Sequence, residues 1–391
     1  MTTPQDPAFA FALPPGIAVR EEAGDPLTAR LFAEPPHPYR TPFSRDCGRI
    51  LHARAFRRLA GKTQVFTRRP AESDHVRSRL THTLEVAQIA RTAAAVLGLN
   101  ATLAETLALV HDIGHPPFGH AGEQALNAAL REHGLGFDHN LHALRIVTSF
   151  EERYASFRGL NLTLGVREGI VKHSRDYEAA SHPELGSYFL SQFPPLEAQL
   201  IDLADEIAYT TADMEDGLES GILVLDELRA EVPLFGDFYS IAASEYAAAE
   251  PRLLANEALK RMLNSMVTDL MRTLAAETRA LGATTLADVR NAPSRVARLS
   301  PSMEARRKVA KAYLYRSLYE SPTMVAEHTH AREVIERLFS AWVADPALLP
   351  EDHQLRAQQE GAPRAVADYL AGMTDGYIEQ AWRRHLGLVG A

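Results

Sequence analysis

The chain has 391 residues, of which 46% are hydrophobic, and its formal net charge at pH 7 is −9. This length and hydrophobic content are enough to bury a large core, in one large domain or in two joined ones. The negative net charge argues against a protein that coats nucleic acid, so nucleic-acid binding is not indicated. A single cysteine, Cys47, excludes an intrachain disulfide framework and fits a reducing compartment, from which we expect a cytoplasmic protein.

The N-terminal segment predicts an irregular arm, because the first 40 residues hold eight prolines. Residues 8–19 are mostly apolar, but Pro14 and Pro15 interrupt them and no basic residue precedes them. The segment therefore fits neither a signal peptide nor a membrane span, and we expect no membrane attachment.

A basic segment follows, in which residues 45–79 contain ten Lys or Arg and only three Asp or Glu. One interpretation is a solvated helix face, which we prefer for Arg54, Arg68 and Arg69. The other is a cationic rim that attracts a polyphosphate to an otherwise anionic protein. Because the segment leads directly into His82, we favour the second interpretation for the segment as a whole.

The rest of the chain predicts helices, because Ala- and Leu-rich stretches recur with a period near 3.6 residues. The predicted helices cover residues 82–97, 101–112, 121–132, 139–150, 197–215, 254–281, 304–319, 330–343 and 364–385. Residues 159–164 are the one candidate for a short strand pair, and no alternation is long enough for a sheet. The predicted fold class is therefore all-α.

One segment, Val110–Glu123, is rich in titratable side chains, because it holds three histidines and two carboxylates within 14 residues. It closes an apolar helix in which Leu103 and Leu107 are spaced i, i+4, and a glycine and two prolines then end that helix. The pattern predicts His111 and Asp112 on the last turn of a buried helix, facing a loop. Ligands on a rigid element beside an opening are typical of a metal site.

Further metal ligands are expected from two other helices. His82 lies early in the predicted helix 82–97, and Asp202 and Asp205 lie in the predicted helix 197–215. Spacing alone does not choose between these two aspartates. Two imidazoles with two carboxylates suit a divalent Mn, Mg, Co, Fe, Ni or Zn ion.

Four motifs, in this order, resemble those of the dGTPase-like branch of the HD phosphohydrolases. They are Phe56–Val65 (FRRLAGKTQV), Arg79–His82 (RLTH), Val110–Glu123 and Ala204–Tyr209 (ADEIAY), and a looser match is Lys311–Pro322. The resemblance implies an HD-domain helical core with a C-terminal helical lobe packed on it. We therefore expect an irregular arm over residues 1–40, a catalytic core over 41–230 and a C-terminal helical region over 231–391 that completes the pocket.

The resemblance also implies an activity, the metal-dependent hydrolysis of deoxynucleoside triphosphates to deoxynucleoside and intact triphosphate. Its implied metal ligands are His82, His111, Asp112 and Asp205. The family's catalytic dyad corresponds to His120 and Glu123, and His139 corresponds to another active-site histidine. Which of His120 and His139 protonates the leaving O5′ stays open, and Glu123 could instead be only a first-turn residue.

Substrate contacts carry over residue by residue from the same resemblance. The implied sugar contacts are Gln64, Asp213 and Tyr319, and the implied phosphate contacts are Arg79, His115, Tyr209 and Lys311. Each has a plain structural alternative, such as an ion pair for Arg79, a capping role for His115, a solvated acid for Asp213 or core packing for Tyr209. At Glu206 this chain departs from the family members that have a lysine at this position. The Glu206 side chain must therefore point away from the phosphates, or the phosphates are bound by different residues.

Two other functions are weighed against this one. The first is another HD phosphohydrolase, a nucleotide monophosphatase or a hydrolase of guanosine polyphosphates or cyclic nucleotides. The second is a nucleotide-sensing or single-strand-binding regulator with an inactive site, against which the intact ligand set argues. The resemblance further implies a homo-oligomer and dNTP activator sites between subunits.

Overall fold

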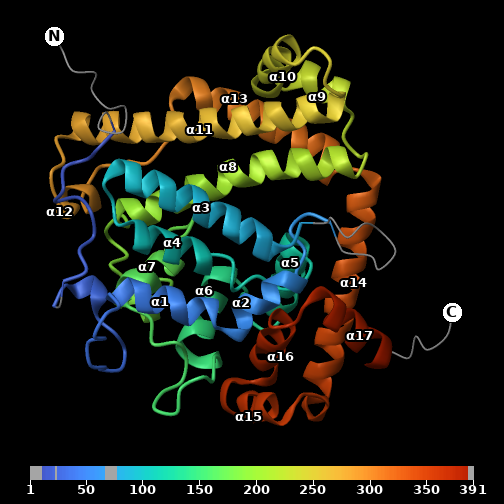
Figure 1. Ribbon diagram of the computed structural model, residues 1–391. Helices are drawn as coiled ribbons and strands as arrows, with labels where there is room; N and C mark the ends of the chain where they lie inside the picture. The colour runs from blue at the N-terminus through green and yellow to red at the C-terminus, as the bar shows by residue number, and fades with distance from the viewer. Residues whose placement is uncertain (1–10, 23, 67–76, 386–391) are drawn as a thin grey trace. The chain divides into compact units, whose positions relative to one another are not determined.

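The structure is a computed structural model of the chain, and it describes residues 11–22, 24–66 and 77–385 (Figure 1). Across these ranges the secondary structure is helical, and the only β-type pairing in them is an isolated bridge between Thr63 and Ser78. The expected all-α fold is thus confirmed. Within the same ranges, no helix combines the length and hydrophobicity that crossing a bilayer requires. The predicted solvated position of Arg68 and Arg69 lies outside the described residues.

The helices of the first half follow the predicted pattern closely. Their bounds are α1 (Pro42–Leu51), α2 (Arg54–Arg58), α3 (Arg79–Leu97), α4 (Ala101–Val110), α5 (Gly119–Arg131), α6 (His139–Arg145), α7 (Leu164–Val171) and α8 (Leu196–Glu219). The predicted helix 139–150 is divided, because α6 passes into a π-helical turn at Ile146–Phe150.

The helices of the second half are α9 (Leu225–Glu231), α10 (Pro233–Glu245), α11 (Pro251–Leu281), α12 (Leu286–Arg290), α13 (Pro301–Leu314), α14 (Pro322–Ala344), α15 (Glu351–Glu360), α16 (Ala362–Ala371) and α17 (Asp375–His385). The predicted helix 304–319 ends in a π-helical turn at Tyr315–Tyr319. The predicted helix 364–385 is two helices, because the chain turns between Ala371 and Asp375.

The strand pair considered at residues 159–164 is wrong. Residues 159–163 have no regular secondary structure, and Leu164 begins α7. The guanidinium of Arg49 donates to the carbonyls of Leu160 and Asn161, at 2.8 and 3.0 Å. These carbonyls therefore find a side-chain donor where a strand would need a partner strand. Asn161 also has a φ of 49°, which lies outside the strand region.

The described chain divides into two compact units, and the first comprises residues up to 48, 84–109 and 163–321. Its longest helix is α11, which runs alongside α8 (Figure 1). A proline opens α11 and Gly282, with a φ of 68°, ends it. The buried residues Met262, Met266, Leu270 and Leu274 repeat every four positions, so one stripe of α11 faces this unit's core.

The second unit comprises residues 49–83, 110–162 and 322–391. Its core is formed where α14 packs against α5 and α16. Ile335, Leu338 and Trp342 lie on one stripe of α14 and are at most 1% exposed, and Leu126 and Leu130 of α5 are fully buried with them. This packing fixes the start of α5, which carries the candidate catalytic residues His120 and Glu123.

Candidate functional site

The helix α4 ends at Val110, and His111 and Asp112 follow in the turn immediately after it. The amide of His115 donates to the Asp112 carbonyl at 3.1 Å and closes this turn. Gly114 is required here, because a Cβ at this position would lie 2.0 Å from the carbonyl oxygen of His139 and 2.5 Å from the amide of Ala143. The absent side chain lets the start of α6 approach the turn.

Three of the predicted metal ligands come together in the second unit. His82 lies on the first turn of α3, and one ligand atom from each of His82, His111 and Asp112 lies within 4.8 Å of the others. All three are at least 96% buried, and the two imidazole centroids are 6.0 Å apart. Two nitrogen donors and one carboxylate fit a divalent transition-metal ion or Mg²⁺.

Asp112 is held as a carboxylate by the cations and imidazoles around it. Burial alone would raise its pKa, but Arg79, whose guanidinium lies 2.8 Å from Oδ2, outweighs burial together with His111 and His115. The pKa therefore lies well below the usual range of an aspartate. Arg79 also donates to the carbonyl of Thr63 at 3.2 Å. The structural alternative for Arg79, an ion pair with an acidic neighbour, is thus present.

His115 lies on the same loop with its ring inside the cluster. Its Nδ1 is 2.9 Å from Asp112 Oδ1, and its ring stacks on that of His139 with centroids 4.0 Å apart. Burial lowers the pKa of His115 well below its usual value, and the charges of Arg79 and His139 lower it further. A neutral imidazole at this position can exchange hydrogen bonds with an oxygen ligand but adds no positive charge.

Glu123, on the first turns of α5, lies between the two other candidate histidines. Its Oε1 is 2.9 Å from His139 Nδ1 and its Oε2 is 3.7 Å from His120 Nδ1. The backbone amide of His139 also donates to Oε1, at 3.1 Å. Burial would raise the pKa of Glu123, but the interactions with His120 and His139 lower it far below its usual value. The carboxylate thus orients both rings, of which that of His139 is mostly buried and that of His120 is exposed.

Two residues that support this loop were not found by sequence reasoning. The carboxylate of Asp375, at the start of α17, accepts from the amides of Thr63 (2.7 Å) and Phe118 (3.0 Å). Lys62 donates from its ammonium nitrogen to the carbonyls of His115 and Ala371. Lys62 falls inside the FRRLAGKTQV motif, whereas Asp375 is 257 residues from Phe118 and carries no local signal. Gln64 lies in the same segment, directly after Thr63.

The remaining predicted residues belong to the first unit. There Asp213 of α8 is fully buried and accepts a hydrogen bond from the hydroxyl of Tyr319. The rings of Tyr209 and Tyr319 stack with centroids 5.9 Å apart. Burial first, and then the charge of Asp213, raise the pKa of both phenols. Both tyrosines therefore act as neutral hydrogen-bonding groups.

The acid Glu206 is paired inside the same unit. Its Oε1 lies 2.7 Å from the ammonium of Lys311 and 2.5 Å from the guanidinium of Arg307. Lys311, which the resemblance assigns to phosphate, is thus an ion-pair partner of Glu206 here, with half of its side chain exposed.

The two aspartates that spacing left open have different surroundings within this unit. Asp202 accepts from the amide of Ser174 at 2.9 Å and from Arg295 at 2.8 Å, and it lies 2.9 Å from His173 Nδ1. Asp205 lies 4.0 Å from His173 Nε2. Asp202 thus has a structural role, which favours Asp205 as the fourth ligand. Since Asp205 is not in the unit of the other three ligands, its part in the cluster stays a prediction.

Comparison with known proteins identifies relatives along nearly the whole chain. Residues 79–210 match the family model of the HD domain, and residues 297–384 match that of the phosphohydrolase-associated domain. A "deoxyguanosinetriphosphate triphosphohydrolase-like protein" of Thiobacillus denitrificans is 46% identical over 356 residues, which cover 91% of this chain and 93% of the relative. Proteins with the same description from Ralstonia pickettii and Brucella canis are 44% and 43% identical, covering 97% and 91% of this chain and 96% and 92% of the relatives.

Proposed function

Since this chain belongs to the family of HD-domain deoxyguanosinetriphosphate triphosphohydrolase-like proteins, we propose that it hydrolyses deoxynucleoside triphosphates to deoxynucleoside and triphosphate. The reaction depends on a divalent metal ion and serves to control dNTP pools. The observation that carries the proposal is the buried cluster of His82, His111 and Asp112, with the Glu123 carboxylate and its two histidines in the same unit.

The cluster fits a resident cation in both donor type and charge. Its nitrogens and one carboxylate are buried side by side, and Asp112 is ionised because its pKa is lowered. A cation held there would polarise a phosphoryl oxygen and lower the pKa of a bound water. Arg79, 2.8 Å from Asp112, places a further positive charge where phosphate oxygens would bind. Positioning and electrostatic stabilisation of this kind dominate phosphoryl transfer.

Proton transfer falls to the histidines that Glu123 orients. When the bond between the α-phosphorus and O5′ breaks, the leaving oxygen needs a proton. The Nδ1 atoms of His139 and His120 both face the Glu123 carboxylate, so either ring can donate that proton to the leaving oxygen. The carboxylate lies against both rings, and it can orient them toward the leaving oxygen.

Recognition of the sugar is assigned to the buried group of the first unit. Asp213 accepts from the Tyr319 hydroxyl, and Tyr209 stacks on Tyr319. A carboxylate in this position can accept from a 3′-hydroxyl, and a tyrosine ring packed on C2′ would exclude a ribose hydroxyl by steric contact. Gln64 is assigned to the same hydroxyl by its place in the motif.

The proposal is tested by one assay with identification of both products. Purified protein is incubated with each dNTP and NTP and a panel of divalent ions, and the products are separated by chromatography. We expect deoxynucleoside plus tripolyphosphate, no activity for His111→Ala, and a loss in kcat of roughly 100-fold or more for Glu123→Gln. Glu123→Gln should keep the metal content of the parent, whereas His111→Ala should lose it.

Orthophosphate or pyrophosphate as the first product would contradict the proposal. It would favour the second candidate, an HD phosphohydrolase acting on nucleoside monophosphates or guanosine polyphosphates. Equal rates on NTPs and dNTPs would contradict only the sugar selectivity assigned to Tyr319. We also propose a homo-oligomer that responds to dNTPs, which sedimentation with and without dNTPs tests directly.

A further inference from the structure

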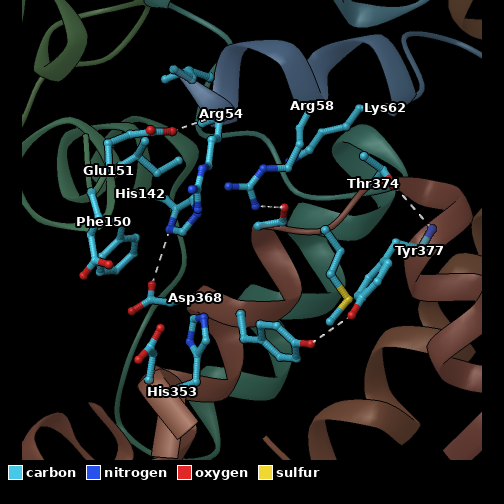
Figure 2. A pocket seen from close by; sticks show the side chains of 18 of the residues that line it. Arg54, Arg58, Lys62, His142, Phe150, Glu151, His353, Asp368, Thr374 and Tyr377 are labelled. Carbon is cyan, nitrogen blue, oxygen red and sulfur yellow. Dashed lines mark hydrogen bonds and ion pairs between the residues drawn. The ribbon is translucent and has the colours of Figure 1, made fainter. Parts of the chain in front are cut away.

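A pocket lies within the second unit, and Figure 2 shows side chains that line it. Its volume is about 520 Å³, within the range of small-molecule sites. Its walls come from α2, from α6 with its π-helical turn, and from α15, α16 and the start of α17. None of the residues assigned to metal, proton transfer or substrate lines it.

Three arginines give this pocket unpaired positive charge. Arg54 and Arg58 are one turn apart on α2, and Arg356 comes from α15. Among the described residues, none of the three lies within 4.0 Å of a carboxylate oxygen. Arg58 donates to the carbonyl of Gly372 at 2.6 Å, and Arg356 stacks on the ring of Phe150 at 4.3 Å. Guanidinium groups left without carboxylates are the groups that proteins use for phosphate.

The most buried acids of the pocket are occupied by other partners. Glu151 accepts from the amide of Ala55 at 2.7 Å. Asp368 pairs with Arg145 at 2.6 Å and faces His142 Nδ1 at 3.3 Å (Figure 2). Glu152 and Asp352 also line the pocket and are exposed to solvent, as Arg54 and Arg58 are. These contacts leave the guanidinium groups of Arg54, Arg58 and Arg356 without a carboxylate within 4.0 Å among the described residues. Burial is the largest cause that lowers the pKa of Arg58, the charge of Glu151 raises it, and the charges of Arg54 and Arg57 lower it.

The buried imidazole of His142 has one ring nitrogen, Nε2, without a hydrogen-bond partner among the described residues. His142 is 3% exposed. Burial lowers its pKa, so the ring is neutral. With Nδ1 toward Asp368, Nε2 is left as an acceptor for a hydroxyl or N–H of a ligand. Unsatisfied buried polar atoms are rare enough to require an explanation of this kind.

The other wall of the pocket is aromatic and apolar. Tyr369 and Tyr377 lie side by side with their hydroxyls 3.4 Å apart, and Met373 also lines the pocket. A flat ring packs well against such a surface. The pocket thus combines guanidinium groups with an aromatic wall.

We propose that this pocket binds a phosphorylated small molecule with a planar ring, of the nucleotide class. Its phosphates face Arg54, Arg58 and Arg356, and its ring lies against Tyr369 and Tyr377. Lys62, which also lines the pocket, donates to the carbonyl of His115, so an occupant contacts a residue that holds the catalytic loop. The proposal does not depend on which reaction the metal cluster performs.

The test is calorimetric titration of the full-length protein with ADP, which can bind without being cleaved to triphosphate. Arg54→Gln removes a pocket guanidinium that has no described partner, and Arg57→Gln is its control. Arg57 lies on the same short helix, is exposed and does not line the pocket. We expect Arg54→Gln to weaken ADP binding about tenfold or more and Arg57→Gln to leave it within about twofold. Thermal melting checks that both variants are folded.

A second experiment tests whether the arginines bind the phosphates of ADP rather than its ring. Tripolyphosphate should compete with ADP in the parent protein, and Arg356→Gln, on a different helix, should weaken both ligands about tenfold. Equal ADP affinity for Arg54→Gln and Arg57→Gln would overturn the proposal, because binding would then occur elsewhere. A failure of tripolyphosphate to compete would also overturn it, since the arginines would not hold the phosphates.

Discussion

At the scale of single residues, neighbouring groups decide the protonation of the carboxylates Asp112 and Glu123, whereas burial dominates for His115. Burial would raise the pKa values of Asp112 and Glu123, yet both are lowered because cations and imidazoles contact the carboxylates. His115 is kept neutral by burial and by the charge of Arg79. Asp112 is therefore in the ionised state that a metal ligand requires, and the neutral ring of His115 beside it adds no positive charge.

Lys62 gives the clearest dependence of stability on pH. Burial first, and then the charge of Arg58, lower its pKa to about 7. Between about pH 7 and about pH 10 the unfolded chain binds a proton that the folded chain does not, so stability rises with pH. Relative to Lys62→Met, we expect the unfolding free energy of the parent to increase by about 1 kcal/mol per pH unit in this range. Urea unfolding at several pH values measures it.

Lys260→Met, at an exposed lysine of α11, controls for the removal of one charge. The parent should show the rise relative to Lys62→Met but not relative to this control variant. A parent and a Lys62→Met variant with parallel stability curves would mean that Lys62 stays protonated in the folded protein. Its two carbonyl acceptors would then stabilise an ammonium ion.

At the scale of helices, the hydrophobic period predicts the number and order of the long helices but not their interruptions. The turns Ile146–Phe150 and Tyr315–Tyr319 are π-helical, although the sequence pattern continues through both. One extra residue in a single turn shifts the apolar stripe too little to be seen over five residues. The sequence pattern does not predict the break between α16 and α17, because no proline lies between these helices. Gly372 is the single residue there that disfavours a helix.

At Gly114, the turn that follows α4 lies very close to the start of α6. A Cβ in Gly114→Ala would lie 2.0 Å from the His139 carbonyl, so the start of α6 must move. We expect a loss of roughly 1–3 kcal/mol in unfolding free energy and a lower kcat, because His139 shifts from Glu123. Gly186→Ala is the control, since nothing lies within 4 Å of its added Cβ. It should stay within about 1 kcal/mol of the parent, and equal effects of the two variants would contradict this account.

At the scale of the whole molecule, the sequence predicts the residues of the site better than the contacts that hold them. His82, His111 and Asp112 are found because motifs with family resemblance mark them, and the structure brings them together. Asp375 is not found, because its amide partners lie hundreds of residues earlier and a lone aspartate is a common surface residue. Hydrogen bonds to backbone amides leave no pattern in the sequence of either partner.

The choice between Asp202 and Asp205 decides which position of α8 supplies the fourth metal ligand. Asp202 is occupied by Ser174, His173 and Arg295, so Asp202→Ala should lower the melting temperature yet keep the metal affinity. If Asp205 is the fourth ligand, Asp205→Ala should weaken binding of Mn²⁺ about tenfold or more. Losing a carboxylate that binds the metal directly should reduce metal affinity at least as much as losing a residue that only orients a ligand. Metal titration followed by calorimetry compares the two variants. Weaker binding in Asp202→Ala with full affinity in Asp205→Ala would reverse the assignment, and full affinity in both would leave the cation to His82, His111 and Asp112 alone.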